Sequence, residues 1–382
     1  MMKTIRFGII GCGLMGREFA SAAARWCHLP QMDVRPSLVA VCDTTPEPFR
    51  WFTDNFPSIG QTTADFQELL SNPDVDAVYI AVPHNLHEKL YCAAIAAGKH
   101  LMGEKPFGID LAANRSILAA LEKTPGCFAR CSSEFPFFPA VQRIGRMIEG
   151  GEFGTILEVN AGFQHSTDLD PQKPMNWKRV IAANGEYGCL GDLGMHPLHM
   201  PLRAGWMPRN VRAILTRLYS HRPGRDGKPA PCETWDNATL LCESVDPLTD
   251  RPFPLTVKTQ RIAPGEKNSW SFEVFGGRRS ARFSSKQANT LQLLDYTGGE
   301  QAWQHIDMGS ELAFPSITGG IFECGFSDVI LQMWASFVSE LAHGTTPGRF
   351  AGCVTPQETN LHHKVLTAAL ESHRTSSVVP IS

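Results

Sequence analysis

Residues 9–16 read Ile9-Ile10-Gly11-Cys12-Gly13-Leu14-Met15-Gly16, and this stretch decides the fold. An apolar run precedes the G-x-G-x-x-G pattern and small residues follow it, so we predict a strand, a tight turn and a helix. The first glycine permits the turn, the second lets a pyrophosphate approach the backbone, and the third lets helix and strand pack closely. The helix start also offers free N–H groups to phosphate. Dinucleotide binding is therefore predicted for Gly11, Cys12, Gly13, Leu14, Met15 and Gly16, the alternative being a packing turn in another α/β protein.

Before residue 133, the chain alternates short apolar runs with helical patterns, which is typical of a parallel sheet with crossover helices. After Phe138 the pattern changes to longer strands with few helices, separated by turns such as Gly276–Gly277. We predict an α/β fold, with an N-terminal Rossmann domain (doubly wound parallel sheet) over residues 1–132. An α+β domain with a large open, mainly antiparallel sheet follows over residues 133–382, for substrate binding and oligomerisation. The last helix, expected at Gln357–Ser372, is a candidate to pack back on the first domain.

Composition argues against several classes of protein. The 382 residues are 43% hydrophobic and 19% charged, as in a globular chain long enough for two domains. The formal net charge of -3 gives no electrostatic reason to expect nucleic acid or a membrane surface as a partner. No apolar run is long enough to span a bilayer, no signal-peptide pattern precedes the first strand, and the cysteines lack zinc spacing. We therefore expect a cytoplasmic, reduced protein without a metal.

Asp43 ends the second predicted strand, Leu38–Cys42. An acidic side chain there accepts hydrogen bonds from the adenosine ribose and repels a 2′-phosphate, which favours NAD over NADP. It lies farther from the glycines than the usual distance of about 20 residues, and we attribute this to an insertion at Cys27–Ser37. Two alternatives stay open: Asp43 as a strand-end turn former, and Arg50 on the next helix as a partner for NADP.

Polar residues also follow the third and fourth predicted strands. Pro83-His84-Asn85-Leu86-His87 and Gly103-Glu104-Lys105-Pro106 fall at the carboxyl ends of parallel strands, where doubly wound folds bind ligands. A lysine at such an edge can hydrogen-bond a substrate hydroxyl and stabilise the alkoxide that develops as hydride leaves. Lys105 is therefore a catalytic candidate, whereas His87 is better explained as the start of a helix.

A second polar cluster lies within the glycine-rich stretch from Gly185 to His199. If Asp192 begins a helix, it shares one face with His196, and a carboxylate beside an imidazole fixes its tautomer and raises its basicity. Pro197 complicates this, because the residue before a proline avoids helical dihedrals; the helix must start late or kink at His196. From the residues alone, a structural and a catalytic role for the pair are equally open.

The order of four motifs carries a resemblance to a known family. The glycine turn, AVPHNxH over residues 81–87, GEKP over 103–106 and GDLGxH over 191–196 resemble the Gfo/Idh/MocA oxidoreductase family, across essentially the whole chain. The resemblance implies hydride transfer between a sugar or cyclitol carbon and nicotinamide, and a homodimer or homotetramer. It implies that Lys105 binds the reacting oxygen, that His196 accepts the proton and that Asp192 orients His196. It also places Pro83, Asn85, Glu104 and Lys105 along the nicotinamide and its ribose.

Several other segments bear on which substrate the protein binds. The family commonly has an Asn- or Arg-containing stretch where this chain has Glu134-Phe135-Pro136-Phe137-Phe138. The identity of the substrate therefore cannot be inferred from the resemblance. Asn176-Trp177-Lys178-Arg179 resembles the W-x-R segment of several sugar dehydrogenases of the group, levoglucosan dehydrogenase among them. Trp177 and Arg179 are therefore candidate cofactor or substrate contacts, with packing as the alternative. Gln164 and His165, at the end of a long strand, are further substrate candidates, and His362–His363 is predicted to lie at the surface.

Three functions are compatible with these features. The leading one is an NAD-dependent dehydrogenase acting on a hydroxyl of a sugar, cyclitol or anhydrosugar. The second is a redox-neutral glycosidase or epimerase that recycles NAD in place, as some members of the family do. The third is a non-catalytic dinucleotide sensor, which the presence of Lys105, Asp192 and His196 argues against.

Overall fold

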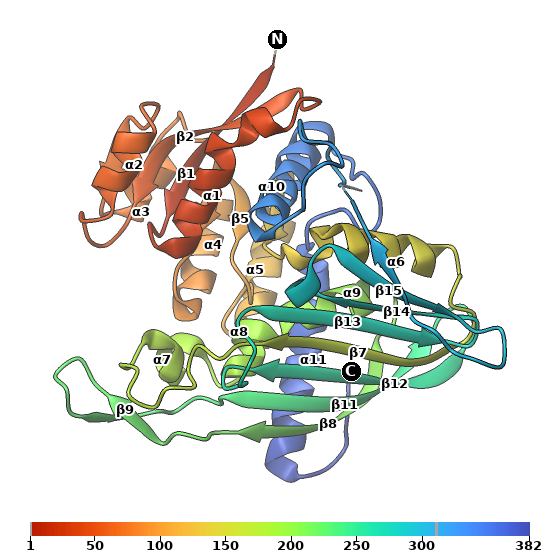
Figure 1. Cartoon of the computed structure of the whole chain (residues 1–382). Helices are drawn as coiled ribbons and strands as arrows, with labels where there is room; N and C mark the ends of the chain where they lie inside the picture. Colours follow the sequence, from red (N-terminus) through yellow and green to blue (C-terminus); the bar gives the residue numbers. More distant parts are fainter. Residues whose placement is uncertain (1, 310–311) are drawn as a thin grey trace. The chain divides into compact units, whose positions relative to one another are not determined.

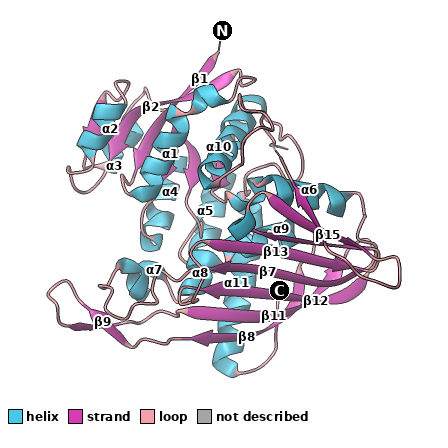
Figure 2. Cartoon of the chain, in the orientation of Figure 1, coloured by secondary structure: helices cyan, strands magenta, loops and turns pink. Residues whose placement is uncertain are grey.

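A computed structural model describes residues 2–309 and 312–382, which fold into two compact units (Figure 1). The first unit is Met1–Phe137 with Ser310–Gln357, and the second is Phe138–Gly309 with Glu358–Ser382. Each unit has its own large sheet and its own helices (Figure 2). The predicted fold class is confirmed. The division at residues 132 and 133 into separate domains stays a prediction, and the structure adds that the chain returns to the first unit up to Gln357 before Glu358–Ser382 rejoin the second.

The first unit is built on a parallel sheet in the order β3-β2-β1-β4-β5-β6. This is the strand order of the doubly wound dinucleotide fold, with β1 and β4 beside each other in the middle. The central strands are apolar and buried because helices cover both faces of such a sheet. The strands are β1 (Lys3–Ile10), β2 (Val34–Cys42), β3 (Gln61–Thr63), β4 (Ala77–Ile80), β5 (His100–Gly103) and β6 (Ala129–Cys131).

The helices of this unit include one from the far end of the chain. Helix α10, which the sequence analysis assigned to the second domain, packs beside α1 and β2. Its Trp334 ring stacks on Phe19 of α1 at 3.6 Å between centroids, so an aromatic cluster anchors it. The helices are α1 (Leu14–Ala24), α2 (Phe49–Asn55), α3 (Phe66–Ser71), α4 (His87–Ala96), α5 (Leu111–Lys123) and α10 (Phe326–His343), with short 3-10 turns η1 (Trp26–His28), η2 (His84–Leu86) and η3 (Phe135–Phe137).

The second unit is built on a mixed sheet in the order β16-β15-β14-β13-β7-β12-β11-β8-β17. Its pairings are antiparallel except that of β7 with β12. Alternating buried and exposed residues, clearest in β11, give the sheet one face toward the core and one toward solvent. The strands are β7 (Ile156–Gln164), β8 (Pro208–Thr216), β11 (Asn237–Asp246), β12 (Arg251–Gln260), β13 (Ser269–Gly276), β14 (Arg279–Ser284), β15 (Thr290–Asp295), β16 (Gln304–Asp307) and β17 (Val379–Pro380), and β9 (His221–Pro223) pairs with β10 (Pro229–Pro231) as a separate hairpin.

Two short helices replace the single helix considered for the stretch from Asp192 to His196. Asp192 lies near the end of α8 and His196 near the start of α9, and Gly194, whose dihedrals are in the α-helical region (φ -68°, ψ -25°), joins the two helices. A Cβ on Gly194 would come within 2.3 Å of the Leu190 carbonyl oxygen, so only glycine fits there. Pro197 is tolerated because it falls in the first turn of α9. The helices of the unit are α6 (Pro139–Glu149), α7 (Ile181–Asn184), α8 (Cys189–Leu193), α9 (Met195–Arg203) and α11 (Pro356–Thr375), with 3-10 turns η4 (Trp177–Arg179) and η5 (Ser285–Gln287).

The prediction that His362 and His363 lie at the surface is wrong. Both side chains are fully buried on the inner face of α11, because the apolar residues around them dock that helix into the core of its unit. The His362 ring stacks on His199 with centroids 6.1 Å apart. Burial lowers the pKa of His362 to about 4, so it packs as a neutral ring.

Residues 2–309 and 312–382 contain neither a membrane-spanning helix nor a cluster of side chains that could hold a metal ion. No helix there is long and apolar enough to cross a membrane. No group of three or more histidine, cysteine, aspartate or glutamate side chains there is arranged to hold a metal ion.

Candidate active site

Each glycine in the turn between β1 and α1 is needed for a different physical reason. Gly11 has φ +100°, and a Cβ there would lie 2.2 Å from the Ala81 carbonyl oxygen. A Cβ on Gly16 would lie 2.3 Å from the carbonyl oxygen of Gly11, so this glycine allows helix and turn to pack. A Cβ on Gly13 would meet nothing within 4 Å. The space above Gly13 is therefore open to a ligand, as a pyrophosphate requires.

The start of α1 presents its amides to that space. Gly13 is the N-cap of α1, and among the described residues no side chain caps it and no acidic residue lies in the first turn. The first N–H groups of a helix have no partner within the helix and carry partial positive charge. Together with the open space at Gly13, this fits the phosphates of a dinucleotide.

Asp43 lies beside the glycine turn, as the sequence predicts. Its Oδ2 accepts a hydrogen bond from the backbone N–H of Cys12 at 2.9 Å, and its Oδ1 accepts one from that of Thr45 at 3.2 Å. The carboxylate is therefore fixed at the end of β2, next to the turn. Burial and then Asp43 raise the pKa of the Cys12 thiol to about 12, so Cys12 remains a neutral packing group there.

The carboxyl ends of β4, β5 and β6 hold a buried polar group centred on Glu104. The Glu104 Oε1 accepts hydrogen bonds from Tyr79 Oη at 2.6 Å and from Ser132 Oγ at 2.7 Å. Tyr91 Oη donates to the Glu104 carbonyl at 2.8 Å. These bonds fix the backbone that carries Lys105, whose side chain is half-buried and whose peptide bond to Pro106 is cis.

Pro83 and Asn85 follow β4 at the same edge. Pro83 is half-buried at the N-cap of η2, and Asn85 is exposed within η2. His87 begins α4, is fully buried, and its ring stacks on Tyr91 at 4.8 Å between centroids. His87 is therefore a packing residue at a helix start, as expected.

In the second unit, Asp192 is the centre of a cationic cluster. Both of its carboxylate oxygens lie 3.2 Å from Lys178 Nζ, and Oδ2 also pairs with the Arg261 guanidinium. Asp192 and Arg261 are buried, whereas one third of the Lys178 side chain is exposed. The carboxylate is therefore held by two cations that sequence reasoning did not identify.

His196 lies on α9, with only 4% of its surface exposed. Its ring meets the edge of Phe163 on β7 with centroids 5.1 Å apart, and the His165 ring contacts Phe163 at 4.6 Å. Gln164 hydrogen-bonds Gln260 at the adjoining end of β12. The end of β7, which carries the substrate candidates Gln164 and His165, therefore lies close to His196, because the Phe163 ring contacts both His165 and His196.

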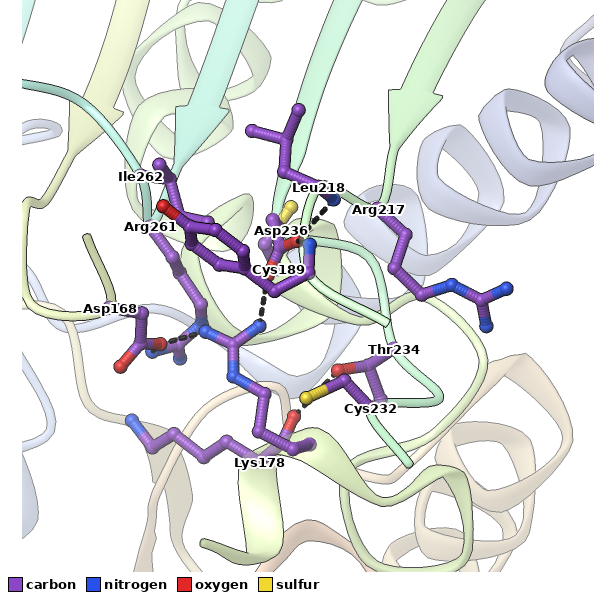
Figure 3. Close-up of polar contacts among 12 residues, drawn as sticks. Asp168, Lys178, Cys189, Arg217, Leu218, Cys232, Thr234, Asp236, Arg261 and Ile262 are labelled. Atoms are coloured by element: carbon purple, nitrogen blue, oxygen red, sulfur yellow. Dashed lines mark hydrogen bonds and ion pairs between the residues drawn. The ribbon is translucent and has the colours of Figure 1, made fainter. Parts of the chain in front are cut away.

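Two buried carboxylates, Asp168 and Asp236, both labelled in Figure 3, enclose Arg179. Its guanidinium pairs with Asp168 through Nη2 and with Asp236 through Nη1, and all three side chains are buried. Arg261 lies beside Asp168 at 3.5 Å, which links this group to Asp192. This pairing favours the packing alternative for Arg179. Trp177 is half-buried next to Lys178, whose Nζ lies 5.5 Å from the centre of its ring.

Comparison with known proteins identifies the family. Residues 5–130 match the family described as "Oxidoreductase family, NAD-binding Rossmann fold", and residues 141–282 match "GFO/IDH/MocA C-terminal domain". The chain is 25% identical to levoglucosan dehydrogenase of Pseudarthrobacter phenanthrenivorans over 76% of each protein. It is 29% identical to D-apiose dehydrogenase of Paraburkholderia graminis over 59% of this chain and 56% of the relative.

Solved structures agree on the fold. A levoglucosan dehydrogenase in complex with NADH superposes with a TM-score of 0.87 at 22% identity, with both chains covered in full. An inositol dehydrogenase homologue complexed with NAD+ from Azotobacter vinelandii gives a TM-score of 0.79 at 20% identity, over 99% of this chain and 97% of that one.

The fold and its nucleotide turn define the protein as an NAD(P)-dependent oxidoreductase. The chain belongs to the Gfo/Idh/MocA oxidoreductase family, as the order of its motifs indicated.

Gly13 and Gly16 offer a matched pair of substitutions. Gly13→Val is expected to leave the thermal unfolding midpoint unchanged, because the space around its Cβ is open, but to raise the Kd for NADH at least tenfold. Gly16→Ala is expected to lower the unfolding midpoint, because its Cβ would overlap the Gly11 carbonyl. Fluorescence titration with NADH and thermal denaturation measure both effects; unchanged NADH binding by Gly13→Val would contradict the assigned phosphate position.

Proposed function

We propose that the protein is an NAD-dependent dehydrogenase that oxidises a hydroxyl group of a sugar, cyclitol or anhydrosugar. The observation that carries this proposal is the position of Lys105 at the carboxyl edge of the sheet that bears the glycine turn. Ligands bind at this edge in doubly wound folds, so a lysine there meets the substrate of a bound dinucleotide. The names of the relatives, levoglucosan dehydrogenase and D-apiose dehydrogenase, support the substrate class.

The proposed chemistry removes two hydrogen atoms from the alcohol, one from the carbon as a hydride and one from the hydroxyl oxygen as a proton. NAD held at the glycine turn would supply the acceptor for the hydride. The Lys105 ammonium donates a hydrogen bond to the reacting oxygen and stabilises the negative charge that develops on it. His196 takes the hydroxyl proton, and the carbonyl double bond forms as the C–H and O–H bonds break. Asp192 orients the imidazole.

Lys178 and Arg261 belong to this proposal as well. They hold the Asp192 carboxylate from two sides, which fixes its direction. Because one third of the Lys178 side chain is exposed, the proposal includes a contact between its ammonium and a substrate hydroxyl. The remaining proposed contacts are Pro83, Asn85, Glu104 and Trp177 for the cofactor and Gln164 and His165 for the substrate.

The preference for NAD over NADP is proposed from Asp43. The ribose of a dinucleotide bound at the glycine turn lies near the end of β2, where the carboxylate repels a 2′-phosphate. Asp43→Asn keeps an oxygen that accepts the Cys12 N–H bond but removes the charge. We expect the ratio of kcat/KM for NADP to that for NAD to rise about tenfold, the size of one charge interaction. An unchanged ratio in steady-state assays would contradict this role.

The proposal also includes a cytoplasmic location and the assembly of the protein into oligomers. The solvent face of the second unit's sheet exposes large apolar side chains, including Leu157, Ile214 and Leu241, each more than half exposed. Such a face favours association. We propose a homodimer or homotetramer assembled through it, and sedimentation of a monomer at micromolar concentration would contradict this.

A substrate panel tests the proposed activity. The purified protein is mixed with sugars, cyclitols and anhydrosugars in the presence of NAD or NADP, and formation of reduced cofactor is followed by absorbance. Net NADH formation with a member of the panel is expected. Product formation without net NADH would instead identify a redox-neutral enzyme, and NADH binding without any turnover would identify a sensor.

A further inference from the structure

The buried ion pairs of the second unit form one connected chain in which acidic and basic side chains alternate. Its members are, in order, Asp236, Arg179, Asp168, Arg261, Asp192 and Lys178. Figure 3 shows the first two of these ion pairs as dashed lines. The first five side chains are buried, whereas one third of the Lys178 side chain is exposed. The chain therefore ends at a cation that solvent reaches, on the carboxylate proposed to orient His196.

The Lys178 ammonium is held in position at that end of the chain. The backbone N–H of Lys178 donates to Asn176 Oδ1 at 3.0 Å, and its carbonyl accepts a hydrogen bond from the Thr234 hydroxyl at 2.8 Å. Its Nζ lies 3.2 Å from both carboxylate oxygens of Asp192. Because the same carboxylate also pairs with Arg261, two cations share one negative charge. These three side chains together carry a net positive charge, and Lys178 is the exposed one among them.

Asp168 is likewise shared by several cations. Besides Arg179, it pairs with Lys173, whose Nζ lies 2.9 Å away, and with Arg261 at 3.5 Å. The Lys173 side chain is 39% exposed. Burial lowers the pKa of the Lys173 ammonium, and the positive charges of Arg261 and Arg222 lower it further. The cations of this region therefore repel one another, as expected where positive charge is in excess.

Arg222 adds a buried positive charge whose hydrogen bonds go to neutral groups. Only 3% of its surface is exposed, and its guanidinium donates to the backbone carbonyls of Asp168 and Asp170. It also lies 5.0 Å from the centre of the Tyr219 ring. The connected group thus has more cations than carboxylates: Lys173, Lys178, Arg179, Arg222 and Arg261 against Asp168, Asp192 and Asp236. An anion that approaches its exposed lysines meets a positive potential.

We propose that the substrate carries an anionic group, a carboxylate or a phosphate, and that the Lys178 ammonium binds this group. The proposal rests on the proposed function, which places the substrate beside Asp192 and His196. A lysine ammonium has three donors and no acceptor, so it binds an anion while Asp192 holds it from the other side. A charge-assisted hydrogen bond to an anion is about twice as strong as one to a neutral group. Lys178 is thus the residue that distinguishes an acidic sugar from its neutral counterpart.

The first test compares acidic and neutral substrates that differ in one group. D-glucuronate and D-glucose 6-phosphate are each paired with D-glucose, and D-gluconate is paired with D-glucitol. With NAD as cofactor, kcat/KM is expected to be at least about tenfold higher for an acidic member than for its neutral partner. A preference for the uronate or gluconate identifies a carboxylate, and a preference for the phosphorylated sugar identifies a phosphate. Equal or better turnover of every neutral partner would overturn the proposal.

Substitution of Lys178 tests whether this residue causes the preference. Lys178→Met removes the ammonium and is expected to lower the acidic-to-neutral ratio of kcat/KM about tenfold, whereas Lys178→Arg keeps the charge and most of the ratio. The ratio cancels any effect on Asp192 that is common to both substrates. Lys228→Met is the matched control, because Lys228 is exposed in the turn between β9 and β10 of the same unit. A ratio that is the same in Lys178→Met and Lys228→Met would contradict the assignment.

Binding measured without turnover separates this proposal from the proposed function. Protein saturated with NADH has no hydride acceptor for an alcohol, so isothermal titration calorimetry with the same compounds measures binding alone. The Kd for an acidic member is expected to be at least about tenfold lower than that for its neutral partner, and to rise about tenfold in Lys178→Met. Equal Kd values, or no binding of any acidic member, would overturn the anion site. Lys178-dependent binding without NAD reduction by any compound would support the anion site and contradict the proposed dehydrogenase activity.

Discussion

Lys105→Met is expected to lower kcat by about 10³-fold while the Kd for NADH changes by less than about threefold. Methionine keeps most of the volume of the lysine stem but offers no donor to the reacting oxygen. The glycine turn and Asp43, which bind the nucleotide end, are distant from this residue in sequence and unchanged by the substitution. The loss should therefore fall on the chemical step, with cofactor binding retained.

Lys123→Met is the matched control for this experiment. Lys123 is exposed in the last turn of α5 in the same unit, so its replacement removes a charge and leaves the sheet edge untouched. Single-turnover kinetics with saturating NAD and fluorescence titration with NADH separate the two effects. Turnover by Lys105→Met at the rate of Lys123→Met would show that the lysine has no chemical role.

Arg179→Met is expected to destabilise the protein by about 3–5 kcal/mol, the cost of removing one partner from a buried ion pair. The substitution leaves Asp168 and Asp236 buried with their main counter-ion removed. Burial lowers the pKa of Arg179, and the negative charge of Asp236 partly offsets this effect. Urea unfolding followed by tryptophan fluorescence measures the change in the free energy of unfolding.

Two further variants test whether the lost stability comes from the buried ion pairs of Arg179. Arg217→Met removes an exposed arginine close by (Figure 3) and is expected to change the unfolding free energy by less than about 0.5 kcal/mol. Asp236→Asn in the Arg179→Met background is expected to recover part of the stability, because it removes one unpaired buried charge. If Arg179→Met were as stable as Arg217→Met, the buried ion pairs would not be a stabilising feature of this unit.

The fold could be predicted from the sequence where periodicity and glycine positions are strong. The strands and helices around the glycine turn, and the change to longer strands after Phe138, were all visible in the pattern of apolar residues. β3 was missed because a strand of only three residues, Gln61–Thr63, has too little apolar pattern to be distinguished from a loop. The return of α10 to the first unit was missed because periodicity identifies a helix but not its partner.

Some contacts of the candidate site could likewise be predicted from the sequence, whereas others could not. Asp43 could be placed beside the glycines because its contact depends on local topology, the end of one parallel strand next to another. Lys178 and Arg261 could not be placed, because the approach of residue 261 to residue 192 depends on the register of β12 in a mixed sheet. The departure at Glu134 was visible, but its burial and its raised pKa depend on packing that the sequence does not reveal.

The most direct test of dehydrogenase activity is the transfer of deuterium from substrate to cofactor. A sugar or cyclitol that supports NAD reduction in the panel is prepared with deuterium at the oxidised carbon, and the reduced cofactor is examined by mass spectrometry. A hydride transfer predicts that the deuterium appears in NADH and that the chemical step slows with the labelled substrate. Deuterium that stays in the product, or that is lost to water without reduced cofactor, would contradict a dehydrogenase.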